Sequence, residues 1–192
     1  GLDGIDIDWE YPCVDSAGID ADPRDSENFP LLLSALRDAL GDGRIVSIAA
    51  GAGTYFCQNT DMAEVARICD YVQLMTYDIR SGFEREAGHH ACLYTGDGDR
   101  LDGSAQSTVE DFSVHGVPKE RMVLGAAFYA RRWEGVPDVN RGLYQRAQTV
   151  GLGGPPYGEI VEKYLSQKGF VRYWDEKAMA PWLFDGSTFL SY

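Results

Sequence analysis

The sequence predicts an α/β fold built on a parallel sheet. Short apolar segments that fit buried strands alternate with segments of helical periodicity, and glycine-rich turns separate them. Strands joined in this way by helices favour parallel pairing through right-handed crossovers. With 192 residues and 44% hydrophobic content, the chain is long enough to form a sizeable core. We therefore expect a globular domain with four parallel strands.

The first strand lies within residues 1–12, where apolar and acidic residues alternate. A period of two places three carboxylates on one face of a strand and three apolar side chains on the other. The carboxylates are those of Asp6, Asp8 and Glu10, and the apolar side chains are those of Ile5, Ile7 and Trp9. Pro12 cannot donate a backbone hydrogen bond, so we expect the strand to stop there and to leave Glu10 at its carboxyl end.

Three carboxylates on one face of an otherwise apolar strand are unfavourable for stability. Like charges disfavour joint ionisation, and burial disfavours each charge. We expect the pKa of at least one of these groups to be raised, so that it stays protonated near neutral pH and can donate a proton. Active sites of parallel α/β folds lie at the carboxyl ends of strands. Two alternatives are a solvated acidic surface strip and a calcium or magnesium site.

A loop at residues 13–25 precedes the first helix, which Ser26 or Asn28 can cap. Apolar residues then recur at spacings of three and four and form one face. These residues are Phe29, Leu32, Leu33, Leu36 and Leu40. Gly41 and Gly43 close this helix.

The next segments predict a strand, a helix and a strand. Residues 44–50 fit a buried strand, and Gly51-Ala52-Gly53 lets the chain turn out of it. Residues 61–69 fit a second helix with Asp61 as its cap. Residues 71–77 form a third strand. Its alternation puts Gln73, Met75 and Tyr77 on one face and Val72, Leu74 and Thr76 on the other, with Asp78 directly at its end.

The second half of the chain differs from the first in composition and pattern. Residues 79–104 form a long, glycine-containing connection, residues 105–114 fit a helix, and residues 122–129 fit a fourth buried strand. Turns and aromatic residues dominate after Tyr129, with one more helix expected at residues 157–167. For most of these aromatic rings we expect packing in a core.

Two motifs carry a resemblance to a known family. The pattern D-x-x-D-x-D-x-E at Asp3, Asp6, Asp8 and Glu10, followed by Tyr-Pro, resembles the catalytic signature of glycoside hydrolase family 18 chitinases. About seventy residues later, the segment Met75-Thr76-Tyr77-Asp78 resembles the M-T-Y-D motif on the sixth barrel strand of that family.

The resemblance implies a fold and a domain organisation. The four expected strands match the fourth to seventh strands of a (β/α)₈ TIM barrel, while the first three and the last are absent, so the chain is interpreted as part of a longer enzyme. Residues 1–132 would be a partial barrel. Residues 133–192 would be the small α+β insertion of the deep-cleft chitinases. Two segments carry this resemblance, Arg172-Tyr173-Trp174-Asp175 and Ala180-Pro181-Trp182.

The resemblance also implies a mechanism, the substrate-assisted and retaining hydrolysis of β-1,4-linked N-acetylglucosamine polymers. Glu10 would be the general acid and base, and Asp8 would bond the acetamido N–H. Asp6 would hydrogen-bond Asp8 and share its proton, and Tyr77 would bond the acetamido carbonyl. No cofactor or metal is needed. Asp3 would support the backbone.

Substrate-binding candidates lie just past the expected strand ends, where aromatic rings can stack on sugar faces. They are Met75, Asp78, Tyr11, Tyr55, Phe56, Phe83, Tyr129 and Arg131. Phe83 stands where relatives often carry a tryptophan. The segment 125–131 departs from the family pattern G-x-P-x-Y-G-R at two small positions but keeps Tyr129 and Arg131.

Composition and resemblance together indicate the partners. A net charge of −13 argues against binding to nucleic acid or to an anionic membrane surface. The resemblance implies chitin or chito-oligosaccharides as substrate, secretion, and a monomeric full-length enzyme, with the isolated segment expected to be inactive. The alternatives are an endo-β-N-acetylglucosaminidase that acts on glycoprotein glycans, and an inactive chitin-binding lectin of the same fold.

The spacing of the four cysteines, Cys13, Cys57, Cys69 and Cys92, does not fit a zinc site. From composition alone, disulfides and small buried hydrophobes are equally open. Strand polarity places Cys69 at the end of the sheet opposite the other three, so we favour a disulfide among Cys13, Cys57 and Cys92.

Overall fold

The computed structural model describes residues 1–166 and 169–192, and the chain forms two compact units. The first unit comprises Gly1–Met75 and Thr108–Gly125, and the second comprises Thr76–Ser107 and Ala126–Tyr192. None of the helices in the described part of the chain has the length and hydropathy that a membrane crossing requires.

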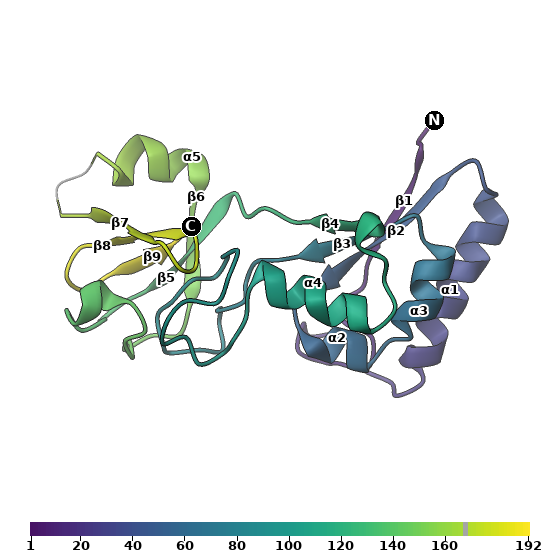
Figure 1. Ribbon diagram of the computed structural model, residues 1–192, viewed down its shortest axis with the longest axis horizontal. Helices are drawn as coiled ribbons and strands as arrows, with labels where there is room; N and C mark the ends of the chain where they lie inside the picture. Colours follow the sequence, from purple (N-terminus) through teal and green to yellow (C-terminus); the bar gives the residue numbers. More distant parts are fainter. Residues whose placement is uncertain (167–168) are drawn as a thin grey trace. The chain divides into compact units, whose positions relative to one another are not determined.

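The first unit is built on a parallel sheet of four strands, as the sequence predicts (Figure 1). The strands are β1 (Gly4–Asp8), β2 (Ile45–Gly51), β3 (Tyr71–Met75) and β4 (Met122–Leu124), and they pair in chain order. In this register Asp6 lies opposite Ser47, and Asp8 lies opposite Ala49. Parallel pairing brings the carboxyl ends of β1, β2 and β3 to the same edge of the sheet.

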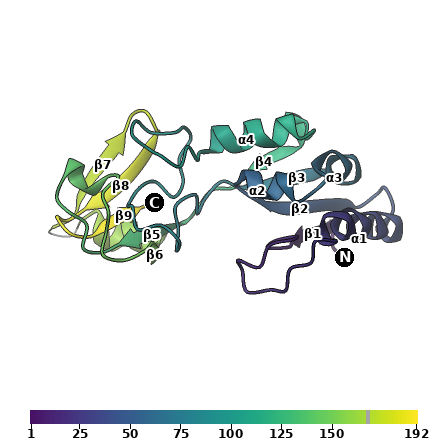
Figure 2. The same cartoon turned by 90° about the horizontal axis from the view of Figure 1, so that it is seen from below.

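Helices cover one face of this sheet. They are α1 (Asp25–Leu40), α2 (Thr54–Gln58), α3 (Met62–Ile68) and α4 (Ala105–Val114), with a 3₁₀ turn at Lys119–Arg121 before β4. Figures 1 and 2 show α1 and α3 side by side next to the strands. The residues buried between helices and sheet include Phe29, Leu33, Val46, Ile48, Phe56, Val65, Val72, Leu74 and Phe112. Burial of these side chains is the main stabilising term of the first unit.

Helix boundaries agree with the sequence in α3 and α4 and differ in α1. Asp61 caps α3, its carboxylate accepting from the backbone N–H of Glu64 at 3.0 Å. Helix α1 begins at Asp25, before the predicted caps, and its N-cap residue makes no side-chain capping bond. The Asp25 carboxylate instead accepts from the N–H of Asp22, which fixes the preceding loop. The short helix α2 has no counterpart in the prediction.

The apolar face predicted for α1 is only partly buried. Phe29 and Leu33 are completely inaccessible, whereas Leu32 is 40% exposed and Leu40 is 38% exposed. The buried stripe is therefore narrower than the periodicity alone suggested, because only the side chains that face β2 and α3 lose contact with water.

Strands β1 and β3 end two or more residues earlier than predicted. Ladder pairing of β1 stops at Asp8, so Glu10 lies in the bend that follows the strand. Strand β3 stops at Met75, and Asp78 has a φ of 55°, a left-handed conformation that cannot continue a strand. The prediction that Glu10 and Asp78 sit directly at strand ends is corrected accordingly.

The strand predicted at 122–129 is divided between the two units. Strand β4 ends at Leu124, and β5 (Tyr129–Trp133) belongs to the sheet of the second unit. The small residues of 125–127 explain the break, because glycine and alanine are weak strand formers. The expected burial is also wrong: Val123 is 43% exposed and Leu124 is 51% exposed, since β4 is an edge strand of the first sheet.

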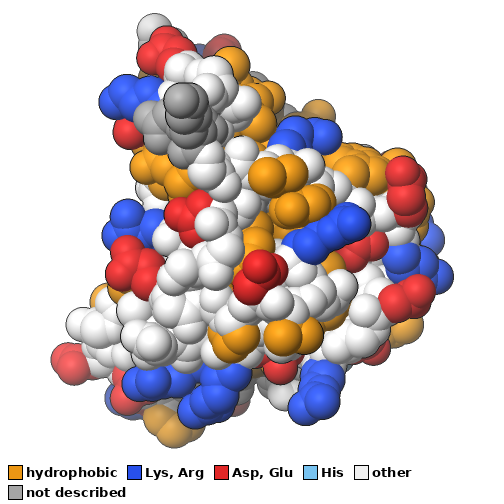
Figure 3. All heavy atoms as spheres, turned by 90° about the vertical axis from the view of Figure 1, so that its left-hand side faces the viewer, with side chains coloured by type: hydrophobic (Ala, Val, Ile, Leu, Met, Phe, Trp, Pro, Cys, Tyr) orange, Lys and Arg blue, Asp and Glu red, His pale blue; other side chains and the backbone are white. Residues whose placement is uncertain are grey.

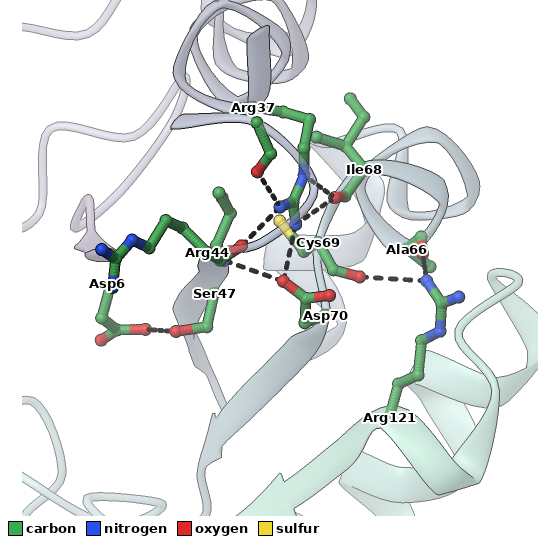
Figure 4. Close-up of polar contacts among 11 residues, drawn as sticks. Asp6, Arg37, Arg44, Ser47, Ala66, Ile68, Cys69, Asp70 and Arg121 are labelled. Carbon is green, nitrogen blue, oxygen red and sulfur yellow. Dashed lines mark hydrogen bonds and ion pairs between the residues drawn. The ribbon is translucent and has the colours of Figure 1, made fainter. Parts of the chain in front are cut away.

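Ionic contacts fasten the amino-terminal end of the first sheet (Figure 4). Arg37 on α1 pairs with Asp70 at 2.6 Å and donates to the carbonyl of Arg44 at 2.6 Å. Asp70 also accepts from the backbone N–H of Val46 at 2.9 Å. Arg121 donates to the carbonyl of Cys69 at 3.0 Å. These bonds tie α1 and the turn before β4 to the loops that enter β2 and β3.

The second unit contains an antiparallel sheet (Figure 1). Its order is β6 (Leu152–Pro156), β5 (Tyr129–Trp133), β9 (Phe189–Ser191), β8 (Ala180–Phe184) and β7 (Val171–Asp175). One apolar cluster centres on Trp133, Trp182 and Phe189, and another on Ile160, Leu183 and Leu190. Many of the aromatic rings after Tyr129 therefore pack in a core, as predicted.

The helix predicted at 157–167 is shorter than expected. It consists of one α-helical turn, Tyr157–Glu159, that continues as a π-helical turn, Ile160–Tyr164. Gln167, the last residue of the predicted helix, lies outside the described residues.

Residues 79–104, all of which the structure describes, form no helix or strand, in agreement with the predicted long connection. A buried ion pair anchors this segment: Arg80 is 1% exposed and contacts Asp99 at 2.5 Å. His89 contacts Asp175 of β7 at 3.2 Å, which links the connection to the antiparallel sheet.

The chain carries a net charge of −13. On the face shown in Figure 3, acidic and basic side chains are interspersed, and hydrophobic side chains reach the surface between them. This face therefore carries no field of a single sign.

We predict that Leu33→Ala lowers the free energy of unfolding by about 2–5 kcal/mol, because it opens a cavity under α1. The matched control is Leu31→Ala on the same helix, where Leu31 is 66% exposed and truncation should change stability by less than about 0.5 kcal/mol. Urea titration of both variants measures the difference. Equal losses would contradict the packing described here.

Candidate functional site

The acidic strip consists of Asp6 and Asp8 on β1 and of Glu10 just after this strand. Its two strand residues lie on the sheet face that the helices leave uncovered. Ile7 and Trp9 pack against the buried core, and the Trp9 ring lies 5.5 Å from the Phe29 ring in a perpendicular arrangement. Alternation along the strand then turns Asp6 and Asp8 to the other face. Among the described residues, no group of three or more His, Cys, Asp or Glu side chains is arranged to hold a metal ion.

The three carboxyl groups of the strip influence one another. Loss of solvation raises the pKa of Asp8, and the negative charges of Glu10 and Asp6 raise it further, together with a hydrogen bond between Asp8 and Glu10. The predicted effect on at least one member of the strip is therefore present at Asp8. A raised pKa means that Asp8 keeps its proton to higher pH than an ordinary aspartate, so the strip can hold a shared proton.

Glu10 begins a chain of hydrogen bonds that includes two tyrosines. The hydroxyl of Tyr11 is hydrogen-bonded to Glu10 and to Tyr55, and the rings of Tyr11 and Tyr55 are 5.2 Å apart and nearly perpendicular. Burial raises the pKa of both tyrosines, so both hydroxyls remain protonated at neutral pH. A Cβ atom on Gly51 would come within 2.2 Å of the Tyr55 hydroxyl oxygen. The glycine at the end of β2 thus makes room for this hydrogen-bonded chain.

Two polar residues that the sequence analysis did not select contact Asp6. Ser47 on β2 and Gln73 on β3 both donate to Asp6 Oδ1, at 2.6 Å and 2.7 Å. Polar residues at alternate positions of otherwise apolar strands were the signal that could have identified them, because this pattern places them on the same face as the acids.

The two other candidates of the first unit differ in accessibility. Met75 ends β3 and is half-buried. Phe56 lies in α2 with 1% exposure and packs among core rings, 6.1 Å from Phe112 and 6.4 Å from Phe29. The assignment of Phe56 as a sugar platform is therefore wrong, because a buried ring offers no face to a ligand. The unpredicted helix α2 turns this residue into the core.

In the second unit, Asp78 is the centre of a polar cluster. Arg131 donates to both carboxylate oxygens of Asp78, each at 2.6 Å. The Tyr129 hydroxyl is hydrogen-bonded to Asp78, and the rings of Tyr129 and Tyr77 are 6.0 Å apart. His90 Nδ1 lies 3.5 Å from Asp78 Oδ1. The structure thus brings together Tyr77, Asp78, Tyr129 and Arg131, and adds His90, which the sequence analysis did not select.

The environment of Asp78 fixes its charge. Burial alone would raise the pKa of Asp78, but hydrogen bonds from His90, Arg131 and Tyr129, and the charge of Arg131, outweigh burial and hold it well below its ordinary value. Burial and the bond to Asp78 raise the pKa of Tyr129. Asp78 is therefore a permanent anion and Tyr129 a permanent hydroxyl donor near neutral pH.

Phe83 is a separate candidate within the second unit. It belongs to the long connection and is 78% exposed, so its ring is accessible to a ligand.

All four cysteines are free thiols, which contradicts the expected disulfide among Cys13, Cys57 and Cys92. Cys13 lies with its sulfur against the carbonyls of Pro23 and Asn59, and Cys57 is buried in the core of the first unit. Burial raises the pKa of Cys57, Cys69 and Cys92 to about 12. These three behave as small buried hydrophobes, which was the alternative interpretation.

Comparison with known proteins identifies the family. The sequence pattern of glycosyl hydrolases family 18 matches residues 1–192, the whole chain. The chain belongs to glycoside hydrolase family 18. This family 18 chain is 34% identical to Chitinase A1 of Niallia circulans, over 100% of the chain and 31% of that protein. It is 30% identical to Endochitinase 1 of Metarhizium robertsii, over 98% of the chain and 44% of that protein.

Solved structures agree with this assignment. A family 18 N-acetylglucosaminidase from Paenibacillus barengoltzii is 54% identical, with a TM-score of 0.97 over 100% of this chain and 58% of that one. A cell-surface-expressed, multi-modular chitinase of a Paenibacillus species is 37% identical, with a TM-score of 0.93 over 100% of this chain and 24% of that one. The family 18 chain thus spans less than half the length of the two curated relatives named above.

We predict that Arg131→Met destabilises the protein at pH 7 by about 1–3 kcal/mol, because it leaves the Asp78 anion without its bidentate partner. The stabilisation from a lowered carboxyl pKa is present above the ordinary aspartate value of about 4 and is lost as pH falls through the lowered one. The difference from the wild type should therefore shrink below about pH 4. Chemical denaturation at pH 7 and pH 3 measures it.

The control for this variant is Arg24→Met, which removes the exposed pair between Arg24 and Asp22. Exposed pairs contribute little, so no measurable loss is expected there. A loss for Arg131→Met that is equally large at both pH values would contradict the assignment.

Proposed function

We propose that this chain is the central catalytic part of a chitinase, which hydrolyses β-1,4-linked N-acetylglucosamine polymers with retention of configuration. The observation that carries the proposal is the acidic strip of Asp6, Asp8 and Glu10, in which loss of solvation and the charges of Glu10 and Asp6 raise the pKa of Asp8, and Asp8 is hydrogen-bonded to Glu10. Membership of glycoside hydrolase family 18 supports the reaction class. Chitin and chito-oligosaccharides are the proposed substrates.

In the proposed mechanism Glu10 protonates the glycosidic oxygen, and the acetamido oxygen of the same sugar attacks C1 to form an oxazolinium ion. Asp8 accepts a hydrogen bond from the acetamido N–H and stabilises the developing positive charge. Water then adds to C1 with Glu10 as the base. The hydrogen bond of the Tyr11 hydroxyl to Glu10 supports this role, because it orients the carboxyl group.

The proposed binding residues present donors, acceptors and rings to a sugar. Tyr77 donates to the acetamido carbonyl. The anion of Asp78, fixed by Arg131, accepts from sugar or acetamido donors, and Tyr129 donates from its hydroxyl. Met75, Tyr55 and Phe83 supply apolar contact. The 78% exposure of Phe83 supports a stacking role.

We further propose that β1 to β4 are the fourth to seventh strands of a (β/α)₈ barrel, and that residues 133–192 form the α+β insertion of the deep-cleft group. The parallel pairing of β1 to β4 in chain order supports the first part, and the antiparallel sheet of the second unit supports the second. We also propose secretion and a monomeric enzyme. A cell-surface relative supports a place outside the cytoplasm.

A second candidate function is an N-acetylglucosaminidase that releases single sugars. The relative from Paenibacillus barengoltzii, which carries that name, is 54% identical, against 34% for Chitinase A1. Product analysis on a chitohexaose distinguishes the two. Early accumulation of monomer alone supports the glucosaminidase, whereas dimers and longer products support the chitinase.

We predict that Glu10→Gln in the full-length enzyme lowers kcat on chito-oligosaccharides by at least about 10²- to 10⁴-fold, or about 3–5.5 kcal/mol of barrier, because the amide cannot donate a proton in the transition state. The control is Glu120→Gln, an exposed residue of the turn before β4, which should keep the wild-type rate. Initial rates on a fluorogenic chitobioside measure both. Near wild-type turnover by Glu10→Gln would contradict the proposal.

A further inference from the structure

We propose that Ser47 and Gln73 are positioning residues that orient Asp6 and keep its negative charge available to Asp8. This inference rests on the proposed function, since it concerns Asp6, one of the two carboxyl groups whose charge raises the pKa of Asp8 in the proposed site. It adds two residues from two further strands, neither of which contacts the reacting atoms in the proposed mechanism.

The geometry joins three adjacent strands through one oxygen atom. Asp6 Oδ1 accepts from Ser47 Oγ at 2.6 Å and from Gln73 Nε2 at 2.7 Å, while Gln73 Nε2 lies 3.4 Å from Ser47 Oγ. Figure 4 shows the side chains of Asp6 and Ser47 directed toward each other. Because β1, β2 and β3 are locked in register by their ladders, the donors approach Asp6 in a fixed arrangement.

Polar side chains at these two positions are unfavourable for stability unless they are hydrogen-bonded, which indicates that Ser47 and Gln73 have a role beyond packing. Ser47 is 6% exposed and lies in a strand whose other members are Ile, Val, Ala and Gly. Gln73 has Val and Leu as its neighbours in β3. A buried hydroxyl without a partner is unfavourable, and an alanine in its place would avoid that requirement. Here the partner of both groups is the same carboxylate oxygen.

The donors determine which oxygen of Asp6 can take a proton. A carboxylate oxygen that accepts two short hydrogen bonds is stabilised in its charged form and is a poor site for a proton. Neither donor contacts Asp6 Oδ2, so this is the oxygen left for a proton. The two bonds also hold the Asp6 carboxylate in one orientation, so its charge acts on Asp8 from a fixed position.

Among the described residues, the titratable groups that interact with Asp6 include Asp8 and a cysteine. Asp8 lies two residues further along the same strand, and the charge of Asp6 raises its pKa. The Cys69 thiol, just before β3, also interacts with Asp6, but burial raises the pKa of Cys69 to about 12, so the thiol is neutral at assay pH. Ser47 and Gln73 do not titrate. The proton balance is thus governed by the carboxyl groups and by the two donors.

The test is the pH dependence of kcat/KM for Ser47→Ala and Gln73→Met in the full-length enzyme. Each change removes one donor from Asp6 Oδ1, which leaves more uncompensated negative charge beside Asp8 and raises the pKa of Asp8 further. The acidic limb of the profile should move up by about one pH unit in either variant. Gln73→Glu should move it further, because a second carboxyl group next to Asp6 favours proton uptake.

The control is Tyr71→Phe, two residues earlier on the same strand at a residue that is 44% exposed, which should leave the profile unchanged. Active variants whose acidic limb stays at the wild-type pH, with only a lower unfolding temperature, would show that the two donors are structural and would overturn this inference alone. A wild-type enzyme that does not hydrolyse chito-oligosaccharides would overturn the proposed function, and this inference with it.

Discussion

The candidate site of the first unit depends on three carboxyl groups held close together at and just after β1. Loss of solvation raises the pKa of Asp8, and the neighbouring charges of Glu10 and Asp6 raise it further. The surrounding sheet tolerates this because it supplies compensation nearby. Donors from β2 and β3 reach Asp6, and the Tyr11 hydroxyl reaches Glu10. The apolar half of the same strand, through Ile7 and Trp9, fixes β1 to the core.

Several charges elsewhere in the molecule are paired. At the amino-terminal end of the first sheet, Arg37 and Asp70 compensate each other and hold loops in place. In the second unit, Arg80 pairs with Asp99 under the long connection, and Arg131 holds Asp78 with two bonds. Paired charges stabilise structure or fix a binding anion, whereas Asp6, Asp8 and Glu10 form no ion pair with a cation in the part of the chain that the structure describes. This difference agrees with the general tendency of perturbed carboxyl groups to mark catalytic sites.

Much of the fold of the first unit was accessible from periodicity. The helices at α3 and α4, the burial of Val72 and Leu74, and the parallel order of four strands follow from local patterns of apolar residues. Errors arose where a local pattern could not report on neighbours. Leu32 and Leu40 fit the apolar face of α1 but remain partly exposed, and the run at 122–129 divides between two sheets. The free cysteines show the same limit, since thiol proximity depends on packing that spacing does not encode.

The sequence by itself determined the acidic strip and its alternation with Ile7 and Trp9, because a strand of period two fixes which side chains share a face. The second motif, Met75 to Asp78, was identified by its resemblance to a family motif. Tertiary structure decided the rest of the site. Ser47, Gln73 and His90 lie far from the acids or from Asp78 in the chain and reach them only through strand register and loop packing. The burial of Phe56 also depends on tertiary contacts, because its ring packs against Phe29 and Phe112, which come from other helices. Contacts between distant segments set these outcomes, and no local pattern contains them.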